Sequence, residues 1–214
     1  MRLVLPKLYV ILDGSLITSS ERDCALGLAE AGVRLLQYRN KSARSRQYLD
    51  SSRELAERLR PHGVSFIVND RPDVAFLAGA SGVHVGQDDL EVEQARRVLG
   101  EDKLVGVSTH NLDQFERAAK SSADYIAVGP VFGTFSKANP DPVVGLDFLC
   151  RVRALTDKPI VAIGGITLGR AAAVIEAGAD AVAVISGILN APDPFERAKQ
   201  YLKTLEAAKH AAAV

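Results

Sequence analysis

Two cations and an amide that could bind an anionic ligand gather around one short apolar run of the sequence. The run spans residues 34–38, and Gln37, Arg39 and Lys41 lie at alternate positions within it and after it. Since successive side chains of a strand point to opposite faces, these three side chains should share one face. Their types suit a phosphate or diphosphate, although a strand end braced by ion pairs would use the same residues.

Carboxylates follow the next two apolar runs. Asp70 comes two residues after the run 65–68, and Asp88 and Asp89 come shortly after the run 82–85. Mg²⁺ binds one or two carboxylates and completes its shell with phosphate and water, so carboxylates at adjacent strand ends would suit a metal-assisted diphosphate site. Asp is also a favoured residue at helix starts, and we expect Asp88 or Asp89 to cap the helix that begins near Glu91. Asp70 precedes an Arg-Pro pair that is likewise typical of a helix start.

Two further polar residues lie in the following strands. His84 lies inside an apolar run, where a hydrogen-bonded core histidine is a more common finding than a ligand. Ser108 follows residues 104–107 and could donate to a phosphate or to a bound ring, but a serine before a helix is first of all a cap. Neither residue indicates a site by itself.

The segment after residues 125–128 has the composition of a lid. It runs to about residue 142, longer than most strand-to-helix connections, and carries Thr134, Ser136 and Lys137 among glycines and prolines. Phe132 and Phe135 would be unusual in a loop that is merely solvated. These features predict a loop that closes over an anion.

Glycines mark a second anion site at the end of the chain. Gly164 and Gly165 follow residues 160–163, and Ser186 and Gly187 follow residues 181–185. Barrel enzymes commonly bind a phosphate between the last two strand ends, with glycine N–H groups and a helix N-terminus as donors. The sequence therefore predicts a phosphate here, separate from the diphosphate expected near Arg39.

These candidate residues are positioned by a strict alternation of strand and helix patterns. The predicted strands, each a run of four to six mainly apolar residues, are 8–12, 34–38, 65–68, 82–85, 104–107, 125–128, 160–163 and 181–185. Helical spacing of apolar residues lies between them, and only the helix near residues 73–78 is short. Eight such units predict a single-domain α/β fold, a (βα)₈ TIM barrel over residues 1–214, with 207–214 as a frayed tail. Motifs such as Ala31-Gly32 and Ala177-Gly178 recur before even-numbered strands and indicate left-handed glycines at helix ends.

Composition excludes several classes of function. Lys plus Arg and Asp plus Glu number 26 each, so no net charge favours nucleic acid or an anionic membrane. No apolar run is long enough to span a membrane, and a cytoplasmic protein is expected. Cys24 and Cys150 lack metal-ligand spacing and are expected in the core. The predicted partners are small molecules, and a homo-oligomer stays open.

Taken together, the strand-end motifs resemble the thiamine phosphate synthase family along essentially the whole chain. The motifs are Gln37-Tyr38-Arg39-Asn40-Lys41, Val68-Asn69-Asp70, Gly86-Gln87-Asp88-Asp89, Gly106-Val107-Ser108, Gly129-Pro130-Val131-Phe132, Thr134-Phe135-Ser136-Lys137, Gly164-Gly165-Ile166 and Ile185-Ser186. The resemblance implies that an aminopyrimidine diphosphate is held by Gln37, Tyr38, Arg39, Asn40, Lys41, Asn69, Ser108 and Lys137. It implies that Mg²⁺ binds Asp70 and Asp89, and that a thiazole phosphate is surrounded by Thr134, Phe135, Ser136, Gly165, Ile185 and Ser186.

The reaction implied by the resemblance couples 4-amino-5-hydroxymethyl-2-methylpyrimidine diphosphate to a thiazole phosphate and releases pyrophosphate. Arg39, Lys41, Ser108 and Lys137 are the expected catalytic residues, since charge on the departing diphosphate must be neutralised. Ser136 and Gly133 stand where the family more often has Thr and Pro, which could loosen the lid.

Three other functions are less compatible with these residues. A thiazole tautomerase would lack the metal carboxylates and carry His in place of Pro130, so Asp70, Asp89 and Pro130 argue against it. A non-catalytic regulator that binds thiamine phosphates should have lost a charged site residue. A sugar-phosphate epimerase should carry paired Asp acids or a His cluster on a metal, and neither is evident.

Overall fold

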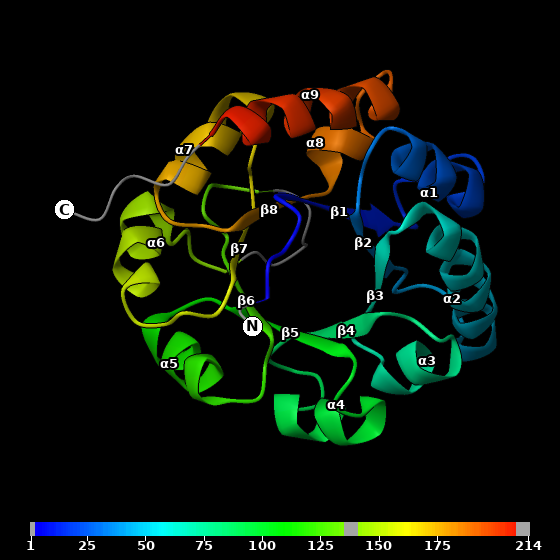
Figure 1. Cartoon of the computed structure of the whole chain (residues 1–214), viewed down its shortest axis with the longest axis horizontal. Helices are drawn as coiled ribbons and strands as arrows, with labels where there is room; N and C mark the ends of the chain where they lie inside the picture. Colours follow the sequence, from blue (N-terminus) through cyan, green and yellow to red (C-terminus); the bar gives the residue numbers. More distant parts are fainter. Residues whose placement is uncertain (1–2, 135–140, 209–214) are drawn as a thin grey trace.

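A computed structural model describes residues 3–134 and 141–208 of the chain. Eight parallel strands close into a barrel in the order β1 to β8, as predicted (Figure 1). Their bounds lie within two residues of the expected ones: β1 Leu8–Asp13, β2 Leu35–Arg39, β3 Ser65–Asn69, β4 Gly82–Val85, β5 Leu104–Thr109, β6 Tyr125–Val128, β7 Ile160–Ile163 and β8 Ala181–Val184.

Helices cover the outside of the barrel (Figure 1). They are α1 Glu21–Glu30, α2 Ser45–Leu59, α3 Pro72–Leu77, α4 Val92–Leu99, α5 Leu112–Lys120, α6 Gly145–Arg153, α7 Ala171–Glu176, α8 Ser186–Leu189 and α9 Pro194–Ala207, with 3₁₀ turns Arg60–His62 and Leu168–Arg170. The expectation of a single short helix was wrong. Both α3 and α7 have six residues, because a 3₁₀ turn occupies the start of the α7 segment, and α8 has four.

Alternation along the strands separates two apolar clusters. Tyr9 and Ile11 of β1 lie in the cluster that fills the barrel, with Leu35 of β2 and Tyr125 of β6. Their neighbours Leu8, Val10 and Leu12 lie in the larger cluster between the strands and the helices. The period of two therefore decides which side chains point inward, including those at the strand ends.

The glycines predicted at the ends of helices have the expected conformation. Gly32, Gly79 and Gly178 have φ values of 105°, 66° and 105°, which only glycine adopts without strain. The expectation for the cysteines was half right. Cys24 is buried, whereas Cys150 is exposed, because it lies on the outer face of α6.

Partly buried ion pairs join helices to strands at the end of the barrel opposite the strand ends described above. Arg96 of α4 donates to Asp124 (2.5 Å), and the same carboxylate oxygen accepts from the backbone N–H of Val105 at the start of β5 (2.7 Å). Arg153 of α6 and Asp180 repeat this pairing at 2.7 Å, two strand–helix units later. These pairs hold helices to strands away from the site.

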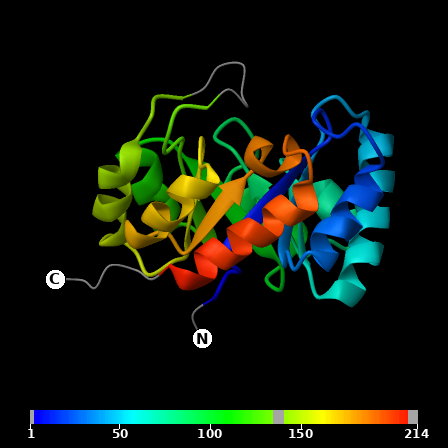
Figure 2. The ribbon, with the colours of Figure 1, turned by 90° about the horizontal axis from the view of Figure 1, so that it is seen from above.

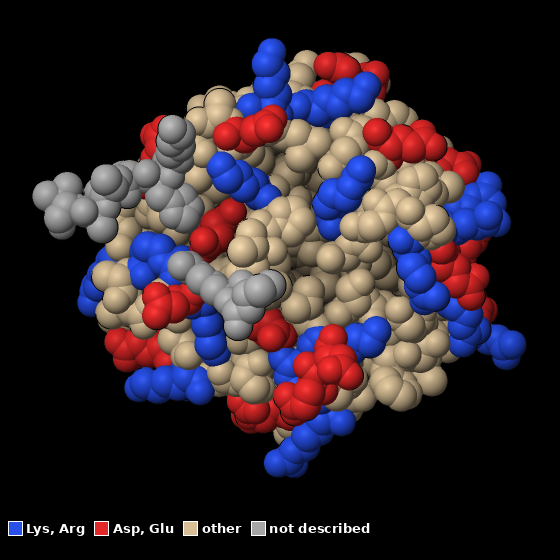
Figure 3. All heavy atoms as spheres, in the orientation of Figure 1, with Lys and Arg blue, Asp and Glu red and all other residues tan. Residues whose placement is uncertain are grey.

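The two ends of the barrel can be told apart in the figures. Figure 2 shows α8 and the loop after β1 at the end opposite the N-terminus. The face in Figure 3 has Lys and Arg side chains interspersed with Asp and Glu, which agrees with the balanced charge. In the described residues, no helix is long and apolar enough to cross a lipid bilayer.

Candidate active site

An ion pair joins the ends of the first two strands. Asp13 of β1 lies opposite Arg39 of β2 in the strand register, and the guanidinium of Arg39 donates to the Asp13 carboxylate. The other Asp13 oxygen accepts from the backbone N–H of Ser15 (3.0 Å) and from its hydroxyl (2.6 Å). Asp13 was not selected as a site residue from the sequence. Its position at a strand end was the available signal.

Lys41, Asp70 and Asp89 form a second charged group. The ammonium of Lys41 lies 3.3 Å from Asp70 Oδ2. Burial and the neighbouring Asp89 carboxylate raise the pKa of Asp70, while Lys41 opposes that shift. Asp70 also has a φ of 63°, an uncommon conformation for a residue other than glycine. Two carboxylates from the loops after β3 and β4 thus lie close together beside a lysine.

The expected capping roles of the aspartates were wrong. Helix α4 is capped by Glu91, whose backbone N–H donates to the side chain of Gln94 (3.2 Å). Asp88 is exposed, and Asp89 instead turns back to accept from the backbone N–H of Gly86 (2.8 Å). The loop after β4 is long enough to separate both aspartates from the helix start. Arg71, not Asp70, occupies the cap position of α3.

The carboxylate pair fits a magnesium ion that is completed by substrate. No group of three or more His, Cys, Asp or Glu side chains is arranged around a common point in residues 3–134 and 141–208. Mg²⁺ does not require such a group, because it is often held by one or two carboxylates plus phosphate oxygens and water. Burial first, and then the neighbouring Asp89 carboxylate, raise the pKa of Asp70, and a divalent cation bound between the two carboxylates would offset both effects.

Three predicted residues lie at the inner wall of the barrel mouth. Gln37 is buried, and its Nε2 donates to Tyr9 Oη at 2.7 Å. The hydroxyl of Ser108 lies 2.9 Å from Nε2 of His84. Asn69 is buried at the end of β3, where its backbone is held by the hydroxyl of Tyr48.

His84 is a hydrogen-bonded core histidine, as expected. It is buried, and its two ring nitrogens contact Tyr125 and Ser108.

Two other predicted residues point away from the mouth. Tyr38 is fully buried in the layer between the strands and the helices, and its hydroxyl donates to Glu21 of α1 (2.7 Å). Asn40 Nδ2 also donates to Glu21 (3.0 Å), while its Oδ1 accepts from the backbone N–H groups of Ser42 and Ala43. The cause is alternation, since both residues fall between the inward-facing Gln37, Arg39 and Lys41. Their side chains shape the loop after β2.

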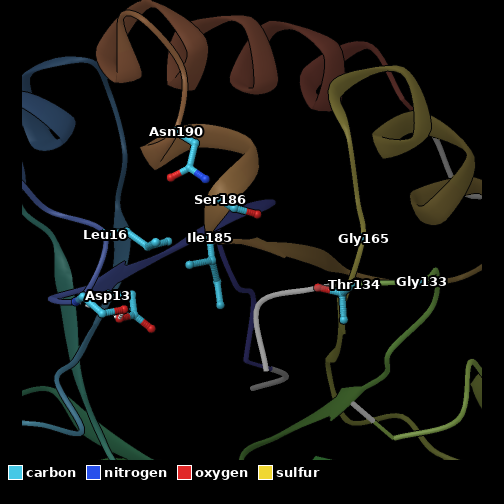
Figure 4. A pocket seen from close by; sticks show the side chains of 9 residues that line it. Asp13, Leu16, Gly133, Thr134, Gly165, Ile185, Ser186 and Asn190 are labelled. Atoms are coloured by element: carbon cyan, nitrogen blue, oxygen red, sulfur yellow. Dashed lines mark hydrogen bonds between the residues drawn. The ribbon is translucent and has the colours of Figure 1, made fainter. Parts of the chain in front are cut away.

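The described residues predicted around the thiazole phosphate line one cavity. Its volume is about 520 Å³, and its lining consists of Asp13, Ser15, Leu16, Gly133, Thr134, Gly165, Ile185, Ser186 and Asn190. Figure 4 shows Asp13 and Leu16 on one side, Gly133 and Thr134 on another, and Ile185, Ser186 and Asn190 along the short helix α8 and its two caps. The side chain of Asn190 was not anticipated from the sequence. The cavity reaches Asp13, so the phosphate region adjoins the Asp13–Arg39 pair.

Two loops beside this cavity are fastened to each other. Arg170 Nη1 donates to the carbonyl of Gly165 (3.1 Å), and its guanidinium lies 4.6 Å from the centre of the Phe132 ring. Gly165 has a φ of 62°, and a Cβ added there would lie 2.4 Å from the carbonyl oxygen of Gly133. The backbone of the β7 loop therefore packs directly against the loop after β6. The predicted site residues Phe135, Ser136 and Lys137 lie outside the described residues.

Comparison with known proteins decides the family. Residues 8–188 match the family described as thiamine monophosphate synthase. This chain belongs to that family. Among its relatives, the thiamine-phosphate synthase of Koribacter versatilis is 51% identical over 95% of this chain and 97% of its own length. The corresponding protein of Chloroflexus aurantiacus is 44% identical, covering 91% of this chain and 90% of its own length.

A solved structure agrees with this family assignment. Thiamine phosphate pyrophosphorylase from Pyrococcus furiosus superposes with a TM-score of 0.85 at 32% identity, covering 94% of this chain and 96% of that one. The orotidine 5′-phosphate decarboxylase of Pyrococcus horikoshii, at 18% identity and a TM-score of 0.65, shares the fold alone. The family resemblance found in the strand-end motifs is thereby confirmed.

Proposed function

We propose that this chain is a thiamine-phosphate synthase, a transferase that couples 4-amino-5-hydroxymethyl-2-methylpyrimidine diphosphate to a thiazole phosphate. The observation that carries the proposal is the adjacency of two sites. A cavity lined by Thr134, Gly165 and Ser186 meets the Asp13–Arg39 pair. The Asp70–Asp89 pair lies at neighbouring strand ends of the same barrel mouth. A reaction in which a phosphorylated nucleophile displaces a diphosphate from carbon requires both anionic groups to be held side by side.

The thiazole phosphate is assigned to the cavity between β7 and β8. Gly165 and Ser186 lie at adjacent strand ends, and the lack of a side chain at Gly165 lets a phosphate approach the backbone. Thr134 supplies a hydroxyl from the loop after β6. Phe135 and Ser136 of the same loop are proposed to complete this site on the resemblance to the family.

The pyrimidine diphosphate is assigned to the ends of β2 to β5. Gln37, Asn69 and Ser108 would contact the ring, because all three lie at the ends of inward-facing strand positions. Asp70 and Asp89 would hold Mg²⁺, which when bound neutralises diphosphate oxygens. Tyr38 and Asn40 would affect substrate binding indirectly, because they hold the loop after β2 in place.

The chain's own cations carry the chemical step. The thiazole nitrogen forms a bond to the pyrimidine methylene carbon, and the bond from that carbon to the diphosphate oxygen breaks, releasing pyrophosphate. Arg39, Lys41 and Lys137 stabilise the negative charge that grows on the leaving diphosphate. Asp13 keeps the Arg39 guanidinium oriented at the mouth. Ser108 orients the pyrimidine ring, so that its methylene carbon lies close to the thiazole nitrogen after the diphosphate has left.

The experiment that tests the proposal is direct. The purified protein is incubated with both substrates and Mg²⁺, and thiamine phosphate is measured after oxidation to fluorescent thiochrome. Product formation that requires both substrates and releases one pyrophosphate per turnover is the expected result. Absence of product, with both substrates bound as measured by calorimetry, would contradict the proposed activity.

Three properties stay predictions from the sequence. We propose that residues 1–214 form one catalytic domain and that the reaction takes place in the cytoplasm. The oligomeric state, monomer or homo-oligomer, is the third property. Sedimentation and cell fractionation would test these points.

A further inference from the structure

A buried chain of hydrogen bonds crosses the barrel from Gln37 to Ser108. Gln37 Nε2 donates to Tyr9 Oη at 2.7 Å, and the hydroxyl of Tyr9 lies 3.0 Å from that of Tyr125, a residue 116 positions later. Tyr125 Oη lies 3.1 Å from Nδ1 of His84, and His84 Nε2 lies 2.9 Å from Ser108 Oγ. The two ends of this chain are the residues assigned above to the pyrimidine ring.

The middle of this hydrogen-bond chain is buried away from solvent. Tyr9 and Tyr125 are 1% and 0% exposed, and burial raises the pKa of both phenols, so each keeps its hydrogen at any physiological pH. Tyr125 also stacks on the His84 ring with a centroid separation of 5.6 Å. A Cβ at Gly106 would lie 2.0 Å from the Tyr125 ring, so this glycine leaves the space that the ring occupies. The phenols are therefore held in place by packing as well as by hydrogen bonds.

Each phenol has one hydrogen to donate, so the hydrogen-bond chain can run in one donor-to-acceptor direction. Because Gln37 donates to Tyr9, the hydrogen of Tyr9 is directed to Tyr125. The hydrogen of Tyr125 is then directed to Nδ1 of His84. A neutral imidazole with Nδ1 as acceptor carries its hydrogen on Nε2, which donates to Ser108. The hydroxyl hydrogen of Ser108 is left for a ligand, and Gln37 keeps Oε1 as an acceptor.

We propose that Tyr9, Tyr125 and His84 are positioning residues that set Gln37 as an acceptor and Ser108 as a donor, and thereby select a 4-aminopyrimidine. This inference rests on the proposed function. An aminopyrimidine offers the complementary pattern, an exocyclic N–H donor beside a ring nitrogen acceptor. The 4-oxo analogue reverses both groups, so it would leave two polar groups unpaired in the site. Sites built to hydrogen-bond a substrate reject such analogues strongly.

The donor-to-acceptor direction of the hydrogen-bond chain can be measured without substrate, from the tautomer of His84. In protein labelled with ¹⁵N-histidine, the His84 signals are assigned by their loss in His84→Gln. We expect the chemical shift of an unprotonated Nδ1 and a protonated Nε2. The opposite tautomer would overturn the inference, because Ser108 would then be the donor to His84. In Tyr125→Phe, which removes the donor to Nδ1, this preference should weaken.

Specificity provides the second test. The value of kcat/KM is measured for the aminopyrimidine diphosphate and for its 4-oxo analogue in the wild type, Tyr125→Phe and Tyr9→Phe. We expect the ratio between the two substrates to fall at least tenfold in both variants, since a broken chain lets Ser108 and Gln37 reverse their roles. The matched control is Tyr201→Phe, which removes another buried hydroxyl, one that donates to the Ile166 carbonyl at 3.0 Å. This control should keep the wild-type ratio.

The outcomes separate the inference from the proposed function. A wild type that forms no thiamine phosphate contradicts the function, while the tautomer measurement still decides the direction of the chain. If the wild type is active and both folded variants keep its ratio of kcat/KM between the two substrates, the inference is overturned and the proposed function stands. Circular dichroism and thermal melting establish that the variants are folded, and Tyr9→Phe carries the test if Tyr125→Phe is not.

Discussion

The ammonium group of Lys41 lies 3.3 Å from Asp70 Oδ2, so a residue expected to bind diphosphate is paired with a residue expected to bind its metal. Asp89 lies beside the same carboxylate. A metal ion and a diphosphate bound as proposed would compete for these partners, and the ion pair would then have to open. Lys41 is more than half exposed, so it is able to move.

The first prediction concerns the metal carboxylates. Asp70→Asn and Asp89→Asn should each lower kcat about 100-fold and weaken Mg²⁺ binding, because a neutral amide is a poorer ligand for a divalent cation. Activity at varied Mg²⁺ and calorimetric titration of the metal would measure both effects. Asp88→Asn is the matched control and should have a mild effect, because the Asp88 side chain is exposed and α4 is capped by Glu91 instead. Full turnover in EDTA would refute the metal requirement.

The second prediction concerns the phosphate cavity. Gly165→Ala should raise the KM for thiazole phosphate at least tenfold more than the KM for the pyrimidine diphosphate. An added Cβ meets the Gly133 carbonyl at 2.4 Å and is strained at a φ of 62°. Gly169→Ala serves as the control, because nothing lies within 4 Å of a Cβ at that position. If both substrates were affected equally, the two-site assignment would be wrong.

The third prediction concerns Lys137, which lies outside the described residues. Lys137→Ala should cost about 2–4 kcal/mol of transition-state stabilisation, seen mainly in kcat, because the contact strengthens as the diphosphate gains charge. Lys137→Arg should recover part of this, since a planar guanidinium does not replace a compact ammonium. Single-turnover kinetics would separate chemistry from product release. A solvated lysine would give changes within about 0.5 kcal/mol, the size expected for the control Lys203→Ala.

The fourth prediction concerns stability away from the site. Arg96→Met should lower the free energy of unfolding by about 2–4 kcal/mol, because it removes the cation from Asp124 and the donor from the Ser122 carbonyl. Chemical denaturation would measure the loss. Arg97→Met on the same helix is exposed and should change stability by less than about 0.5 kcal/mol. If Arg96→Met lowered the free energy of unfolding no more than Arg97→Met does, the Arg96–Asp124 pair would contribute little to stability.

Much of this molecule could be predicted from short-range patterns. Strand and helix periods are local properties, so eight apolar runs separated by helical spacing were enough to predict a closed barrel. The strand ends were therefore known, and with them most of the polar residues at the mouth, because that end of the barrel carries the site. Gly165 and Ser186 could be paired for the same reason, since they follow adjacent strands.

Contacts across the barrel depended on the tertiary structure. Tyr9 and Tyr125 are 116 residues apart, and only closure of the barrel with this register brings their hydroxyls to 3.0 Å. The direction of Tyr38 and Asn40 toward Glu21 likewise required a helix packed on the outside of β2. The pairing of Arg39 with Asp13 follows from the register between β1 and β2. A sequence specifies the period of each element locally, whereas register and packing are set by the summed free energy of contacts between elements, which no single segment contains.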